Sequence, residues 1–303
     1  MAKKNKVSYT QYTMEQNCKL EYKLTYIDKL APPAQSIHLI FGQAMHEAIQ
    51  TWLKDRFKDP TKTKKFDYSH ILKEVMIKEF KSQTLLVEGT KHFPTDLPTI
   101  QEFYLDGIEI LDYLYENADE LFPTEGYELT GIEIPVNIEL RPNLNYIGYL
   151  DIVIHHIETN KYYIIDLKTS GKGWSDYQKK DKTKTNQLLL YKLFYSTLFN
   201  VPLENIVPKF IILKRKLRQP PEELSYIKPK RITTFIPTHG KISISRAKKS
   251  WDEFIENSFD TDGNRRSDVE YKPNPGPHTC RFCPFNNDET LCKYSFYLEK
   301  GDG

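Results

Sequence analysis

The sequence predicts an α/β protein in which a mixed central sheet is flanked by helices. Two segments of alternating apolar and polar residues, 145–154 and 161–168, indicate neighbouring strands. The polar residues 158–160 between them favour a hairpin turn. A stripe of apolar residues with helical spacing over 41–53, and a further helix from residue 187, would supply the flanking layers.

The predicted hairpin brings two carboxylates together. With the turn centred between residues 158 and 159, opposed residue numbers sum to 317, as those of Asp151 and Asp166 do. A register slipped by two leaves both on the same face, because side chains alternate with a period of two. Like charges opposed on a sheet repel, so we expect a cation between them. Two oxygen ligands with room for water suit Mg²⁺ or Mn²⁺.

Lys168 lies two residues after Asp166, where its ammonium can contact whatever the metal binds. A bound metal lowers the pKa of a water and neutralises phosphate charge, while a lysine positions the water or stabilises developing negative charge. This combination indicates cleavage of phosphodiesters. On the helix that follows, Gln187 and Tyr191 are four residues apart and share a face.

Charge is unevenly distributed along the 303 residues, although the net charge is only +2. Residues 101–140 contain 11 acids and no Lys or Arg, whereas residues 161–250 contain 20 Lys and Arg against 6 acids. A basic block beside a carboxylate site favours a polyanionic substrate, although a solvated basic surface is the alternative. Within it, the lysine-rich loop after Lys168 carries Trp174 and Tyr177, which suits a single strand led into the site.

Several classes of protein are disfavoured. No apolar run reaches the roughly 18 residues that indicate a membrane span, and the lysine-rich start lacks the apolar segment of a signal peptide. We therefore expect a cytoplasmic protein with no membrane partner. No Walker A pattern is present, so the chain is not predicted to be a helicase itself.

The four cysteines have the spacing of metal ligands. Cys280 and Cys283 form a C-x2-C pair, Cys292 follows after eight further residues, and Cys18 precedes the predicted sheet. Disulfides are not expected without a secretion signal. The cysteines alone allow either an iron–sulfur cluster or structural Zn²⁺, with His278 a substitute if Cys18 does not reach. Four ordinary buried cysteines are the further alternative.

The ordered motifs resemble the PD-(D/E)XK nucleases, and more narrowly the RecB-type exonucleases. They are, in chain order, Gly42-x-x-x-His46, Gly148-x-x-Asp151, Asp166-x-Lys168-Thr169 and Gln187-x-x-x-Tyr191. The resemblance implies the PD-(D/E)XK fold, with a metal held by the side chains of His46, Asp151 and Asp166 and the carbonyl of Leu167. It also implies a catalytic role for Lys168 and a site-shaping, DNA-contacting role for Gln187 and Tyr191.

The cysteines resemble the iron–sulfur branch of that family, which includes AddB-type and some CRISPR-associated exonucleases. In that branch one cysteine precedes the nuclease core and three follow it. The resemblance therefore implies a [4Fe–4S] cluster bound by Cys18, Cys280, Cys283 and Cys292. Glu133, in a strand predicted over 129–140, occupies a position where some relatives carry an acid, but its face is not determined by the alternation.

These features predict a single nuclease domain over 1–303. It would comprise a cluster lobe from 1–30 and 270–303, a helical insertion at 55–128 and a catalytic sheet core at 129–215. The expected activity is Mg²⁺- or Mn²⁺-dependent exonucleolytic hydrolysis of single-stranded or duplex DNA ends in recombination, repair or processing, with a possible helicase, recombination or integration partner. A structure-specific endonuclease and a non-catalytic nucleic-acid-binding subunit remain open alternatives.

Overall fold

The computed structural model describes residues 4–61, 67–217 and 229–295. Lys228 of the basic block and the last eight residues of the expected cluster lobe lie outside the described residues. The chain divides into two compact units, which are described separately. The first unit comprises residues 1–33, 135–148 and 240–303, and the second comprises residues 34–134 and 149–239.

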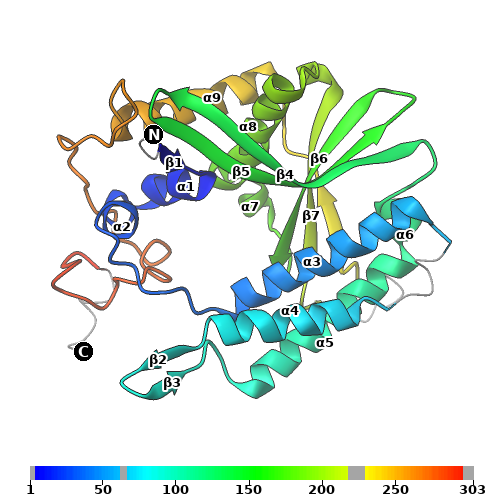
Figure 1. Ribbon diagram of the computed structural model, residues 1–303, viewed down its shortest axis with the longest axis horizontal. Helices are drawn as coiled ribbons and strands as arrows, with labels where there is room; N and C mark the ends of the chain where they lie inside the picture. Colours follow the sequence, from blue (N-terminus) through cyan, green and yellow to red (C-terminus); the bar gives the residue numbers. More distant parts are fainter. Residues whose placement is uncertain (1–3, 62–66, 218–228, 296–303) are drawn as a thin grey trace. The chain divides into compact units, whose positions relative to one another are not determined.

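The second unit contains most of a mixed sheet (Figure 1). The strands of the sheet are β4 (Tyr127–Arg141), β5 (Leu144–His156), β6 (Lys161–Ser170), β7 (Ile206–Lys214) and β8 (Ile232–Phe235). The end of β4 from residue 135 and the start of β5 up to residue 148 belong to the first unit. β5 pairs antiparallel with β6, β6 parallel with β7, and β7 antiparallel with β8, while β4 pairs with β5. The predicted mixed sheet, and the predicted strand beside that of Asp151, are confirmed.

The β5–β6 hairpin has the predicted register. Its Cα partners run from Ile152 and Ile165 to His156 and Lys161, so each pair of numbers sums to 317. Asn160 closes the turn with φ 50°, in the left-handed region that asparagine tolerates better than most residues. The predicted register therefore holds over these pairs, and the recorded pairing ends one residue before Asp151 and Asp166.

Four helices cover one face of this sheet. They are α3 (Ile37–Lys58), α4 (Ser69–Ser82), α5 (Leu97–Glu116) and α6 (Ala118–Leu121). Ile152, Ile165 and Ile211 from the sheet join Phe41 and Ile110 from the helices in one hydrophobic core. All seven apolar residues of the predicted 41–53 stripe are buried in α3. Burial of this stripe holds α3 against the sheet.

Helix α8 (Lys182–Phe199) packs against the opposite face, preceded by the short helix α7 (Asp176–Lys180). The ring of Tyr195 on α8 lies 5.9 Å from that of Tyr162 on β6. Tyr162 shares its face with Asp166, so α8 covers the face on which Asp166 lies. A 3₁₀ turn, η2 (Leu203–Asn205), leads into β7.

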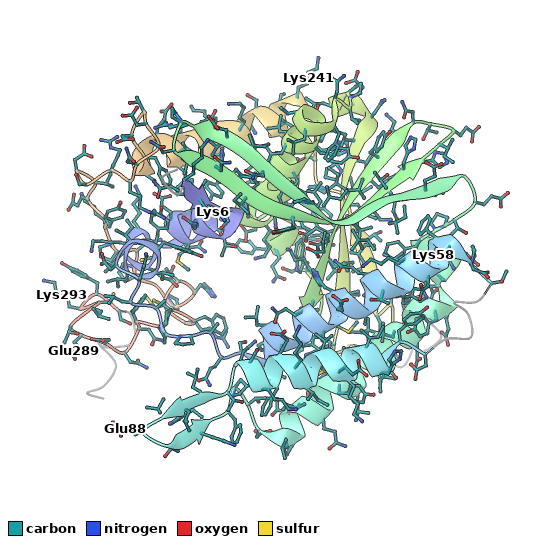
Figure 2. The ribbon with its side chains drawn as sticks, in the orientation of Figure 1. Lys6, Lys58, Glu88, Lys241, Glu289 and Lys293 are labelled. Carbon is teal, nitrogen blue, oxygen red and sulfur yellow. The ribbon has the colours of Figure 1, made fainter. Side chains whose placement is uncertain are left out.

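A small hairpin extends from α4 toward α5. It joins β2 (Leu85–Val87) to β3 (Thr90–His92) through the two-residue turn of Glu88 and Gly89, both with positive φ. Glu88 marks the tip of this hairpin, beyond the ends of the helices (Figure 2). The segment was predicted only as part of a mostly helical insertion.

The first unit has its own aromatic core. β1 (Asn5–Val7) pairs in parallel with the first residues of β5, and it is followed by α1 (Tyr9–Asn17), α2 (Lys19–Tyr22), the π-helix η1 (Lys23–Ile27) and, much later, α9 (Lys241–Ser258). Tyr12 of α1 packs against Trp251 and Phe254 of α9. Within the described residues, no helix has the length and apolar character needed to cross a membrane.

Candidate active site

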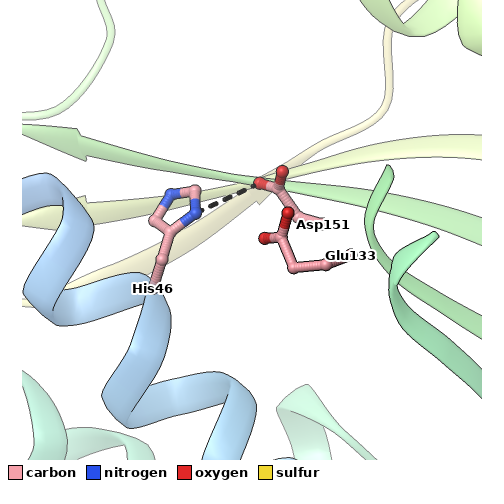
Figure 3. Close-up of side chains that lie close together, drawn as sticks. All are labelled: His46, Glu133 and Asp151. Carbon is pink, nitrogen blue, oxygen red and sulfur yellow. Dashed lines mark ion pairs between the residues drawn. The ribbon is translucent and has the colours of Figure 1, made fainter. Parts of the chain in front are cut away.

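Three side chains from separate elements of the second unit converge on one point. His46 from α3, Glu133 from β4 and Asp151 from β5 each offer a ligand atom, and these atoms lie within 4.8 Å of one another (Figure 3). They are the only such group of His, Cys, Asp or Glu among the described residues. Two carboxylates and an imidazole are suitable ligands for a hard or borderline divalent ion such as Mg²⁺ or Mn²⁺.

The imidazole of His46 is oriented by the backbone of β6. Its Nε2 lies 2.9 Å from the carbonyl oxygen of Leu167, to which it donates when it carries the ring proton. In that tautomer Nδ1 keeps its lone pair and faces Oδ2 of Asp151 at 3.6 Å. Metal-binding histidines are commonly fixed by such a carbonyl. The Leu167 carbonyl, predicted as a ligand, retains its second lone pair.

Asp151 is positioned where the β5–β6 ladder ends. The backbone N–H of Leu167 donates to its Oδ2 at 2.9 Å. Burial, and then the negative charge of Asp166, raise the pKa of Asp151 to about 7, against the opposing effects of His46 and Lys168. A bound cation would compensate this unfavourable charge.

Asp166 and Lys168 form a pair beside this group. The Lys168 Nζ lies 3.0 Å from Oδ1 and 2.8 Å from Oδ2 of Asp166. Burial lowers the pKa of Lys168, but the carboxylates of Asp166 and Asp151 more than reverse this and raise it overall, so the ammonium form persists at neutral pH. Asp166 is 2% exposed, and its Oδ2 lacks a hydrogen bond of acceptable geometry. A buried carboxylate oxygen in this state fits a ligand to a cation, although Asp166 does not belong to the compact group of three.

Glu133 is the candidate site residue whose orientation could not be predicted from the alternation of its strand. Its φ of 50° interrupts β4, and along the strand the more buried side chains change from odd-numbered to even-numbered positions at 131–132. A Cβ at Gly131 would lie 2.8 Å from the side chain of Ile134, so glycine permits this close approach. Gly131 within a strand pattern was the available signal for an irregularity that redirects Glu133.

The predicted Gln187 and Tyr191 both lie on α8. Tyr191 is buried, and its charge, when ionised, acts on Lys168. Gln187 is half-buried one turn earlier. The contributions of both Gln187 and Tyr191 to the site stay predictions.

An open cavity of about 630 Å³ adjoins the group of three. His46, Gln50 and Glu133 line it together with residues of α3 and α4. His46 and Glu133 are therefore open to this cavity, whereas Asp151 and Asp166 are not among its lining residues.

The four cysteines lie in the first unit as free thiols. All four line one apolar cavity of about 20 Å³, which is space for about one water molecule. Burial, with smaller effects of Glu21, Cys18 and Cys292, raises the pKa of Cys283 to about 12. No three of these sulfurs lie within 4.8 Å of one another in the described structure.

Comparison with known proteins decides the family. The sequence profile of the PD-(D/E)XK nuclease superfamily matches residues 6–287. The chain belongs to the PD-(D/E)XK nuclease superfamily. Members of this superfamily use divalent metals, as the group of His46, Glu133 and Asp151 would allow.

Two solved structures are similar to this PD-(D/E)XK chain. One is the "Putative exonuclease" from Eubacterium rectale, with 11% identity, a TM-score of 0.43, and coverage of 80% of this chain and 75% of that one. The other is SSO0001, with 14% identity, a TM-score of 0.30, and coverage of 93% and 95%. Both scores are below 0.5, so the assignment rests on the family match. No curated protein matches the chain.

Proposed function

We propose that this chain is a metal-dependent deoxyribonuclease that hydrolyses phosphodiester bonds from DNA ends. The observation that carries the proposal is the convergence of His46, Glu133 and Asp151 beside the Asp166–Lys168 pair. A protein that only binds DNA has no need to gather carboxylates, because their negative charges repel one another. A catalytic metal site does.

The residues divide the chemistry between them. His46, Glu133 and Asp151 would hold a Mg²⁺ or Mn²⁺ ion, with Asp166 and the Leu167 carbonyl as further ligands. When bound, the ion would activate water and offset the charge of the phosphate. Lys168, held as an ammonium by Asp166, orients the attacking water or stabilises the negative charge that develops on the phosphate. Tyr191 supports Lys168 from α8.

Digestion of end-labelled DNA tests this function. Wild-type protein with Mg²⁺ or Mn²⁺ is expected to release mononucleotides or short oligonucleotides from linear DNA and to leave closed circular DNA intact. Asp166→Asn should abolish cleavage, whereas Glu128→Gln, at another exposed glutamate of the same strand that lies outside the group of three, should not. Equal cleavage by wild type and Asp166→Asn would refute the enzyme, and cleavage of circular DNA would identify an endonuclease instead.

We also propose that Cys18, Cys280, Cys283 and Cys292 bind a [4Fe–4S] cluster. The support is that four free thiols line a single cavity. Four sulfurs around one zinc ion at about 2.3 Å lie only about 3.8 Å apart. In a four-iron cluster each thiolate binds a different iron, so wider spacing is needed. These spacings distinguish the cluster from structural Zn²⁺, which stays the alternative at the same four thiols.

Metal analysis of anaerobically purified protein tests the cluster. Brown protein with about four iron atoms per chain is expected. Loss of iron in Cys283→Ser, with retention in a variant of the neighbouring exposed Phe282, would assign the ligand. Colourless protein containing zinc would contradict the cluster. A helicase, recombination or integration partner stays a prediction.

A further inference from the structure

The segment between β6 and α8 is an ordered loop that adjoins the site at both ends. It begins three residues after Lys168 and leads into the helix that carries Tyr191. The Oγ of Ser170 accepts a hydrogen bond from the N–H of Gly173 and donates one to its carbonyl oxygen, both at 3.1 Å. The N–H of Lys216 donates to the carbonyl of Gly171 at 2.7 Å. The loop is thereby tied to the chain that follows β7.

Trp174 anchors the middle of this loop. Its ring packs 4.9 Å from that of Phe210 and 6.4 Å from that of Phe235. From the sequence, the rings of both Trp174 and Tyr177 were expected to be available for stacking on bases. The structure separates them, because Trp174 is engaged with the sheet and only Tyr177 projects into solvent.

Helix α7 presents Tyr177 from a defined backbone. Ser175 and Gln178 form a capping box at its start, and Asp181 caps the following helix by accepting from Thr183 N–H at 2.9 Å. The Tyr177 side chain is 85% exposed and makes no hydrogen bond or ring contact with the described residues. Single exposed aromatic side chains are common on protein surfaces. The charged residues near Tyr177 therefore decide whether this ring indicates a binding site.

Those charges are predominantly positive. Lys179 and Lys184 each lie 3.4 Å from an aspartate of the same segment. Lys172, Lys180 and Lys182 have no ion-pair partner in the described part of the chain. Three lysines without an ion-pair partner among the described residues thus lie within five residues of an exposed ring that is held on a short, capped helix.

We propose that Tyr177, Lys172, Lys180 and Lys182 form a platform that binds single-stranded DNA on its way to the metal site. The ring stacks on one unpaired base, and the lysines contact the adjacent phosphates. In a duplex the faces of the bases are already stacked on one another, so the platform selects single strands. This inference rests on the proposed nuclease function and specifies its substrate.

DNA binding by a variant that cannot cleave DNA separates this inference from the nuclease proposal. In an Asp166→Asn background, fluorescence anisotropy with a labelled single-stranded oligonucleotide should show about 5- to 100-fold weaker binding for Tyr177→Ala. Tyr177→Phe should bind like the parent. Leu97→Ala, which removes another side chain that is 74% exposed, is the matched control and should have no effect. Cleavage by the wild type is measured independently, so either proposal can fail alone.

Three outcomes would overturn the platform. In the first, Tyr177→Ala binds single-stranded DNA within about twofold of the parent. In the second, Tyr177→Ala weakens binding of single-stranded and of blunt duplex DNA equally. In the third, Tyr177→Phe weakens binding as much as Tyr177→Ala. A second readout is 2-aminopurine placed at successive positions of the strand. Quenching at one position should disappear in Tyr177→Ala and persist in Tyr177→Phe.

The lysines have their own test. Each phosphate contact contributes about 0.7 to the slope of log affinity against log salt concentration for single strands. The double variant Lys180→Gln, Lys182→Gln should therefore have a slope smaller in magnitude by about 1.4. An unchanged slope would show that neither lysine contacts a phosphate.

Discussion

The side chain of Gln50 on α3 donates a hydrogen bond from Nε2 to Oε1 of Glu133 at 2.6 Å. Gln50 is 4% exposed and lies one helical turn after His46. Its Nε2 also lies 3.4 Å from the carbonyl of Asp151. A single helix therefore supplies one candidate metal ligand and the group that orients another.

Removal of this support should weaken metal binding without removing a ligand. We predict that Gln50→Leu, which keeps the buried volume, lowers Mn²⁺ affinity about 10- to 100-fold, the usual effect of losing a partner that orients a ligand. Isothermal titration of Mn²⁺ into the DNA-free protein measures it. Gln43→Leu, an exposed position on the same helix, is the control. Equal affinities for both variants and wild type would contradict the role of Gln50.

The left-handed backbone conformation of Glu133 predicts that this residue lowers the stability of the metal-free protein while its side chain contributes to metal binding. A non-glycine residue with φ near 50° costs about 1–3 kcal/mol, and asparagine tolerates this region better than alanine. Glu133→Asn should lose Mn²⁺ affinity yet melt about 2 °C higher than Glu133→Ala in EDTA. Thermal melts of both variants isolate the backbone effect, since each removes the same charge. Identical melting temperatures would indicate an unstrained backbone.

The raised pKa of Asp151 predicts the pH dependence of the metal-free protein. The folded state holds this proton up to about pH 7, whereas the unfolded state releases it near the ordinary aspartate pKa of 3.8. Between those values the folded state binds more protons, so stability should fall as pH rises from about 4 to 7. Melts in EDTA should show this fall in wild type and a smaller one in Asp151→Asn. Mn²⁺ affinity should rise over the same interval, because binding displaces the proton.

Lys168 is predicted to act as a cation, not as a base. The two aspartates keep its pKa above the usual value, so it remains charged at neutral pH. Lys168→Gln should reduce the rate constant for cleavage about 10²- to 10³-fold while Mn²⁺ still binds. Single-turnover rates from pH 6 to 9 check this. Recovery of the variant at alkaline pH would instead indicate that hydroxide replaces a lost general base.

The sheet and the positions of His46 and Asp151 on their elements could be predicted because they follow local rules. A polar turn and strict alternation were enough to set the register of the β5–β6 hairpin. The apolar stripe was enough to place His46 on the margin of α3. Such features depend on residues close together in sequence, and the structure contains them as expected.

The remaining features depend on contacts between distant segments. The side chain of Glu133 is directed by an irregularity beside Gly131, and alternation cannot place it beyond that point. Its hydrogen bond to Gln50 joins residues 83 positions apart. Trp174 was expected to be available to DNA, but its packing on Phe210 depends on a strand that follows much later in the chain.

The central claim is that these carboxylates, with His46 and Lys168, cut DNA by means of a bound divalent ion. Its most direct test is the initial rate of product release from end-labelled linear DNA as a function of Mg²⁺ concentration, for wild type and Asp151→Asn. We predict a saturable dependence on Mg²⁺ that is absent in EDTA, and a rate at least about 100-fold lower in the variant. Cleavage that is independent of metal, or equal in the two proteins, would contradict the claim.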